Sequence, residues 1–146
     1  MIMASLIMLI PKENHVTRFH PTRHFDSNTH ELLPDAFTLR EDRMEKFVSC
    51  AWVEYSGNKN EDDEKRDITR NMLKETSSSN SIRKGVYSTL KVETIYNVAQ
   101  NLNEKVRVTH EPSVLAPSHA GIYHSNSFRL TRDLAREATK NCKQYP

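Results

Sequence analysis

The chain has 146 residues, close to the commonest size of a single domain, roughly 100–150 residues. Its charges nearly balance: 21 lysines and arginines face 19 aspartates and glutamates, a formal net charge of +2. This balance excludes the strongly basic class of nucleic-acid-binding domains, whose pI is often above roughly 9, although it leaves room for a local basic patch. We expect one domain over residues 1–146.

The first eleven residues form an apolar leader, MIMASLIMLIP. A secretory signal begins with basic residues and ends at a small-residue cleavage site, and the leader has neither. The apolar run is also about half the roughly 20 residues that a membrane-spanning helix needs. The leader therefore favours a buried strand, a short helix or a segment that docks on a partner, with no membrane association.

Hydrophobic patterns in the first half of the chain predict mainly strands. We expect a short strand at residues 15–21, a loop or hairpin at 22–35 and an extended segment at 36–40. The strongest strand signal lies at residues 47–55. Both of its faces are largely apolar, as in a central strand covered on both sides.

The second half alternates helices and strands. Helices are predicted at residues 61–75, 92–102 and 129–140, and strands at 85–90, 105–111 and 119–124. A polar loop is expected at 76–81, and a proline-bounded loop at 112–117. This order predicts an α+β fold, a mostly antiparallel sheet with about three helices packed on one side of it.

The numbers and positions of the cysteines and glycines limit the kinds of functional site that the chain can form. Cys50 and Cys142 are too far apart to make a zinc-ligand spacing or a disulfide framework, so we predict two free thiols in the cytoplasm. With three glycines in the chain, no phosphate-cradling loop or dinucleotide fingerprint can be built. We expect no cofactor.

The strongest candidate for a catalytic or metal site is the pair His110 and His119, with Glu111 beside them. If the strands that carry the two histidines form a hairpin, both flank the mouth of its loop. Two imidazoles and a carboxylate can bind a metal or act as general acid and base. The simpler interpretation, which we favour, is that both side chains hydrogen-bond the loop backbone and hold its shape.

Candidate binding residues lie on the first strand and on the strand at 47–55. His15, Arg18 and His20 belong to a basic cluster that extends to His30 and is suited to phosphate or an acidic partner. A solvated strand edge is the simpler interpretation of that cluster. Trp52 and Tyr55 are expected at the core or its rim, where each polar tip needs a partner.

Four segments together resemble a group of small, uncharacterised bacterial proteins. The segments are ENHVTRFHP, AFTLR, FVSCAWVEYSG and VRVTHEP…PSHAGI. The matching positions are Asn14, His15, Arg18, Ala36, Phe37, Arg40, Ser49, Trp52, Glu54, Tyr55, His110, Pro112, Pro117 and His119. The resemblance implies no particular activity, and by analogy it suggests an accessory role in antiviral defence or a mobile-element system.

Three functions remain open at this point. The first is a non-catalytic accessory or interaction protein that acts with a larger protein partner. The second is a small metal-dependent hydrolase or nuclease that uses His110 and His119. The third is a nucleic-acid-binding module that uses the basic cluster of the first strand. We favour the first, because no enzyme signature is present.

Overall fold

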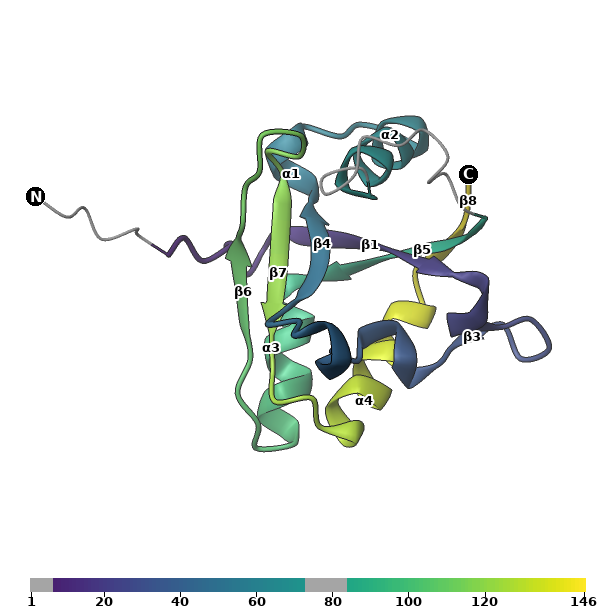
Figure 1. The fold of residues 1–146 in the computed structure, drawn as a ribbon, viewed down its shortest axis with the longest axis vertical. Helices are drawn as coiled ribbons and strands as arrows, with labels where there is room; N and C mark the ends of the chain where they lie inside the picture. Colours follow the sequence, from purple (N-terminus) through teal and green to yellow (C-terminus); the bar gives the residue numbers. More distant parts are fainter. Residues whose placement is uncertain (1–6, 73–83) are drawn as a thin grey trace, which may run out of the picture.

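The computed structural model describes residues 7–72 and 84–146. A six-stranded antiparallel sheet with strand order β6-β7-β4-β1-β5-β8 lies at its centre (Figure 1). The strands are β1 (His15–Pro21), β4 (Val48–Trp52), β5 (Gly85–Lys91), β6 (Arg107–His110), β7 (His119–Tyr123) and β8 (Cys142–Tyr145). The predicted α+β class with a mostly antiparallel sheet is confirmed.

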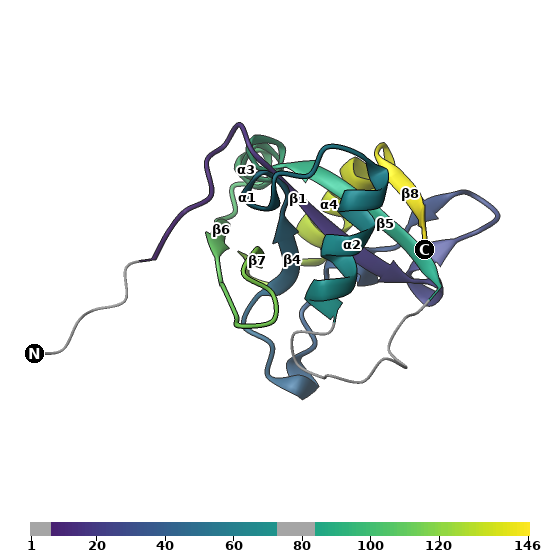
Figure 2. The same cartoon turned by 90° about the horizontal axis from the view of Figure 1, so that it is seen from above.

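Helices cover both faces of the sheet. Helix α2 (Glu61–Met72) packs on β1 and β4 from one side, and α3 (Val92–Asn101) and α4 (Phe128–Thr139) pack on the other side (Figures 1 and 2). Alternate side chains of β1 serve the two faces: Val16 joins the main core, and Phe19 packs with Ile68 of α2. The prediction that the helices share one side is therefore wrong.

The apolar stripes of the helices are those that the sequence indicates. Helix α3 buries Val92, Ile95 and Ala99. Helix α4 begins at a Ser127 cap, whose side chain accepts a hydrogen bond from the backbone N–H of Leu130. The last residues of the helix predicted at 61–75, and the whole loop predicted at 76–81, lie outside the described residues.

Two predicted extended segments are corrected. The strand expected at 47–55 ends at Trp52, and a short helix, α1 (Val53–Ser56), follows it and ends at Gly57 with a left-handed φ of 66°. Residues 36–40 are not a strand: η2 (Pro34–Phe37) is a 3-10 turn that buries Phe37. Proline at the first position favours this helical turn.

The remaining elements are short turns, a separate two-stranded hairpin and the last strand of the main sheet. Residues 22–35 contain η1 (Thr22–His24) and the hairpin of β2 (Phe25–Asp26) and β3 (Glu31–Leu32), as predicted, and η3 (Glu41–Arg43) precedes β4. Strand β8 was not predicted, because its residues are mostly polar. Its anchor is Tyr145, which is 2% exposed and packs edge-on against Phe19.

The described part of the leader pairs with β6. Ile10 is buried, and its backbone N–H donates to the carbonyl oxygen of Val108 at 3.0 Å. Ile7, Met8 and Leu9 are exposed, so the described part of the leader is a paired edge segment that buries Ile10. Among the described residues, no helix is long and apolar enough to cross a membrane.

Candidate functional site

Several predicted site residues meet at one end of the sheet, where three aromatic rings contact one another. Trp52 of β4, Tyr55 of α1 and His110 of β6 define what we call the aromatic end. The ring centroids of Tyr55 and His110 lie 4.8 Å apart, and those of Trp52 and His110 lie 5.2 Å apart. Figure 1 shows α1 beside the β6–β7 loop at this end. The cluster joins segments that are distant in sequence.

Polar contacts fix the aromatic end to the start of β1. The indole N–H of Trp52 donates to Asn14 Oδ1 at 2.8 Å. Glu54 accepts from the backbone N–H of His15, and its other oxygen pairs with His15 Nδ1 at 2.7 Å. Helix α1 turns the chain back after β4, which brings Glu54 to His15 and Tyr55 to the aromatic end. The predicted binding residues His15, Trp52 and Tyr55 are thus neighbours.

Exposed apolar residues lie in the segments next to His110, and we call them the apolar rim. Met8 lies beside His110, since the His110 backbone N–H donates to the Met8 carbonyl oxygen at 2.9 Å. Val114 and Leu115 lie in the loop that follows His110, with 97% and 53% of their surfaces exposed. Tyr55, whose ring contacts His110, is 50% exposed. The apolar rim consists of Met8, Tyr55, Val114 and Leu115, while Leu9 pairs with Thr109 and so lies on the opposite face of the sheet from His110.

His110 and His119 lie on opposite faces of the sheet. The β6–β7 register pairs His110 with Ala120, so His119, one residue earlier, points to the other face. His119 is 4% exposed, its ring packs on Phe47, and its Nδ1 lies 2.8 Å from the Glu111 carbonyl oxygen. His110 Nε2 lies 2.7 Å from the carbonyl oxygen of Pro117. Both rings hold the loop backbone.

Glu111 completes this structural network rather than a catalytic one. Its Oε1 accepts hydrogen bonds from the hydroxyls of Thr109 and Tyr123 at 2.9 and 2.6 Å. Burial and the Glu111 carboxylate raise the pKa of Tyr123. Across residues 7–72 and 84–146, no group of three His, Cys, Asp or Glu side chains is arranged to hold a metal. The geometry does not support the predicted acid–base or metal site.

The basic cluster of β1 is not a solvated edge. Strand β1 lies inside the sheet, between β4 and β5. His20 is fully buried, 2.7 Å from Ser88 Oγ, and burial followed by the charge of Arg18 lowers its pKa well below the ordinary value. His20 therefore cannot contact an external phosphate, and both sequence interpretations of its position are wrong.

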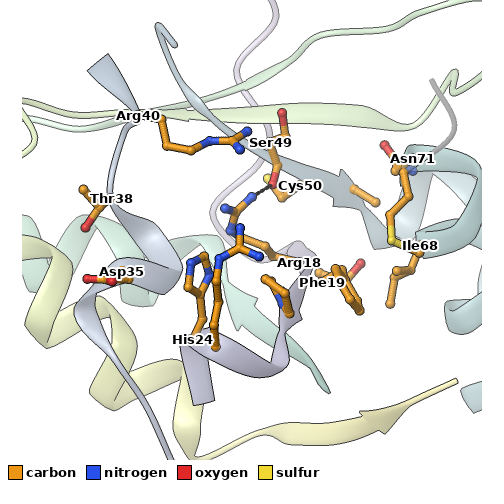
Figure 3. Close-up of a pocket in the computed structure, with 15 residues that line it drawn as sticks. Arg18, Phe19, His24, Asp35, Thr38, Arg40, Ser49, Cys50, Ile68 and Asn71 are labelled. Carbon is orange, nitrogen blue, oxygen red and sulfur yellow. Dashed lines mark hydrogen bonds between the residues drawn. The ribbon is translucent and has the colours of Figure 1, made fainter. Parts of the chain in front are cut away.

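Arg18 lies beside a pocket of about 370 Å³ (Figure 3). Arg23, His24 and Arg40 also line this pocket, which we call the Arg18 pocket. Burial, followed by the charges of Arg23 and Arg18, lowers the pKa of His24. The sequence shows no motif here, because the lining residues come from β1, η1, η2, the segment that follows η2, β4 and α2.

Comparison with known proteins finds no relative of this chain. No protein-family model, no curated protein and no solved structure matches it. The resemblance to small bacterial proteins stays a prediction that rests on the four sequence segments.

Proposed function

We propose that this protein is a non-catalytic binding protein that acts beside a larger protein partner, with the aromatic end as its docking surface. The apolar rim is the observation that carries the proposal. Exposed apolar side chains that lie close together are typical of interaction surfaces, and interfaces are enriched in aromatic residues and methionine. Tyr55 suits this role especially well, because its ring offers a large apolar area and its hydroxyl a polar contact.

The aromatic end is also preorganised. The three rings of Trp52, Tyr55 and His110 brace one another, and Asn14 and Glu54 hold them against β1. A surface that is already ordered loses less side-chain entropy when a partner binds. The rim residues Val114 and Leu115 lie in a loop whose shape is fixed by the bond between His110 and Pro117.

The two alternatives receive less support from the geometry. A hydrolase or nuclease would need His110 and His119 to converge on one open point, whereas the sheet separates them. A nucleic-acid module would need an exposed basic row on β1, whereas His20 is buried. The two thiols favour a cytoplasmic location, and the sequence resemblance suggests, by analogy, a bacterial defence or mobile-element system. We propose both as the setting.

A copurification with matched variants tests the proposal. The tagged wild-type chain, the double variant Tyr55→Ser/Leu115→Ser and the control Phe128→Ser are each purified gently from the source cells and analysed by mass spectrometry. Phe128 is 66% exposed at the start of α4, away from the aromatic end (Figure 1). We expect the wild type and the control to retain the same stoichiometric protein and the double variant to lose it. Retention by all three chains, or by none, would contradict the proposal.

A further inference from the structure

The Arg18 pocket exists because two neighbouring strands separate. Strands β1 and β4 pair only at Val16–Trp52 and Thr17–Ala51, while β1 continues beside β5 as far as Pro21. Beyond Thr17, the backbones of β1 and β4 no longer pair, and side chains lie between the two strands. The guanidinium of Arg18 occupies the opening, where Nε donates to the Ala36 carbonyl oxygen at 2.7 Å and Nη1 donates to that of Ser49 at 2.6 Å.

Arg18 brings a buried positive charge to this opening, and the carboxylate of Glu45, which pairs with Arg40, acts on it only through space. The two bonds of Arg18 go to neutral carbonyl groups, and no ion pair of Arg18 is found within the described part of the chain. An arginine stays protonated even where burial lowers its pKa, as it does here. A desolvated cation without a counter-ion is costly, and an anion in the pocket would offset that cost.

Three buried polar atoms that lack a partner within the described residues belong to the lining of the same pocket. Thr17 Oγ1, His24 Nδ1 and Asn71 Oδ1 are buried and have no hydrogen-bond partner among residues 7–72 and 84–146, and all three residues line the pocket. Buried polar groups are normally paired, so an unpaired one calls for an explanation such as a bound ligand. Thr17 is only 1% exposed, and its unpartnered hydroxyl is therefore a second observation, independent of the charges.

The two sides of the pocket differ in chemistry. Figure 3 shows Arg18, His24 and Arg40 toward one side and Ile68 and Asn71 toward the other. Phe19, Pro21 and Met72 add apolar surface to the lining. Asp35 is the one carboxylate that lines the pocket, among the described residues, against three arginines. A ligand that fits has an anionic group at one end and an apolar body at the other.

We propose that the Arg18 pocket binds a small organic phosphate, with the phosphate at the arginines and the organic body against Phe19, Ile68 and Met72. Arg40 already pairs with Glu45 at 2.8 Å, so the phosphate relies on Arg18 and Arg23. Two guanidinium groups from separate segments suit a tetrahedral phosphate with several oxygens, whereas a planar carboxylate satisfies one guanidinium fork. The volume lies within the range of small-molecule sites, about 300–1,000 Å³. This site is independent of docking at the aromatic end, because it rests on other residues.

Calorimetric titration of the full-length chain at low ionic strength tests the proposal. The probes are phenyl phosphate, benzoate and benzyl alcohol, which share a ring and differ in the attached group. We expect saturable binding of phenyl phosphate, weaker binding of benzoate and none of benzyl alcohol. Saturable binding of benzyl alcohol, benzoate binding as tight as that of phenyl phosphate, or no saturable binding of phenyl phosphate would overturn the assignment.

Three variants locate the binding. Arg23→Gln removes a lining charge that bonds no backbone carbonyl within the described part of the chain, and we expect it to weaken phenyl phosphate binding about tenfold. Thr17→Val removes the unpartnered hydroxyl, and we expect weaker binding with no loss of thermal stability. The control Arg136→Gln changes an exposed charge on α4 and should leave the affinity unchanged. Equal losses in Arg23→Gln and Arg136→Gln would show a general charge effect and reject the site.

Discussion

The Nη1 atom of Arg18 donates to the carbonyl oxygen of Ser49 at 2.6 Å, across the opening where β1 and β4 separate. This bond replaces part of a backbone ladder with a side chain. It keeps the opening polar and positively charged. The same contact therefore supports the sheet and forms one wall of the pocket, so changes at Arg18 should affect stability as well as ligand binding.

Replacing Arg18 with methionine is expected to destabilise the fold by about 2–4 kcal/mol, because two carbonyl oxygens lose their donor. Urea unfolding followed by circular dichroism measures the change. Arg136→Met, on the exposed side of α4, serves as the control and should shift the free energy of unfolding by less than about 0.5 kcal/mol. Equal stability of the two variants would show that the Arg18 contacts contribute nothing.

Acid is expected to weaken the fold through His20. Its pKa is lowered well below 6.5 by burial, so the unfolded chain binds the proton more readily than the folded chain. Stability is therefore complete above pH 6.5 and falls as the pH drops below it, by at most about 1.4 kcal/mol per pH unit for this residue. Lowered pKa values at His24 and His124 act in the same direction.

The His20→Gln variant tests whether His20 causes this loss of stability in acid. The free energy of unfolding is measured for the wild type and the variant between neutral and mildly acidic pH. Glutamine retains a donor for Ser88 and does not titrate. The variant should show a shallower loss of stability on acidification, whatever its stability at neutral pH. Parallel pH profiles would assign the acid sensitivity to other groups.

Two glycines should respond very differently to alanine. A Cβ at Gly85 would collide with the His20 carbonyl oxygen and touch the ring of Phe19, and we expect a loss of about 1–3 kcal/mol or more. A Cβ at Gly57 meets nothing within 4 Å, so only its φ of 66° is strained, at about 1 kcal/mol. Thermal melts of both variants measure the difference. A larger effect at Gly57 than at Gly85 would contradict the packing.

Both thiols should react slowly in the folded chain. Burial raises the pKa of Cys142 to about 11, so at pH 8 its thiolate fraction is on the order of 1 in 1,000. Cys50 is 4% exposed inside the core. Ellman's reagent should label neither thiol rapidly in native protein and both at once in denaturant. Fast native labelling of Cys142 would show that its surroundings open readily.

Much of the secondary structure follows from local patterns. Strand β1 matches the prediction residue for residue. Helix α3 ends one residue earlier than predicted, and α4 is shifted by one residue toward the N-terminus. Their apolar spacing reflects a single buried face, which a periodicity reveals directly. Strand β8 was not predicted, because it contains the polar residues Lys143 and Gln144 and only one buried residue, Tyr145.

The candidate sites were harder to predict, because they depend on register and on long-range contacts. His110 and His119 looked like partners in sequence, and a register that pairs His110 with Ala120 places them on opposite faces. The basic cluster of the first strand looked like an exposed row, and the strand order places it inside the sheet. A one-residue offset in register reverses the face of a side chain, and sequence alone does not specify it here.

The sequence by itself determined the α+β class, most element positions and the absence of familiar cofactor motifs, since these follow from local periodicity and residue type. Tertiary structure alone decided that helices cover both faces, that Trp52, Tyr55 and His110 meet, and that Arg18 lies at an opening between strands. The physical reason is that a site is a convergence of segments distant in sequence. Its geometry is set by packing and strand pairing, which no local pattern contains.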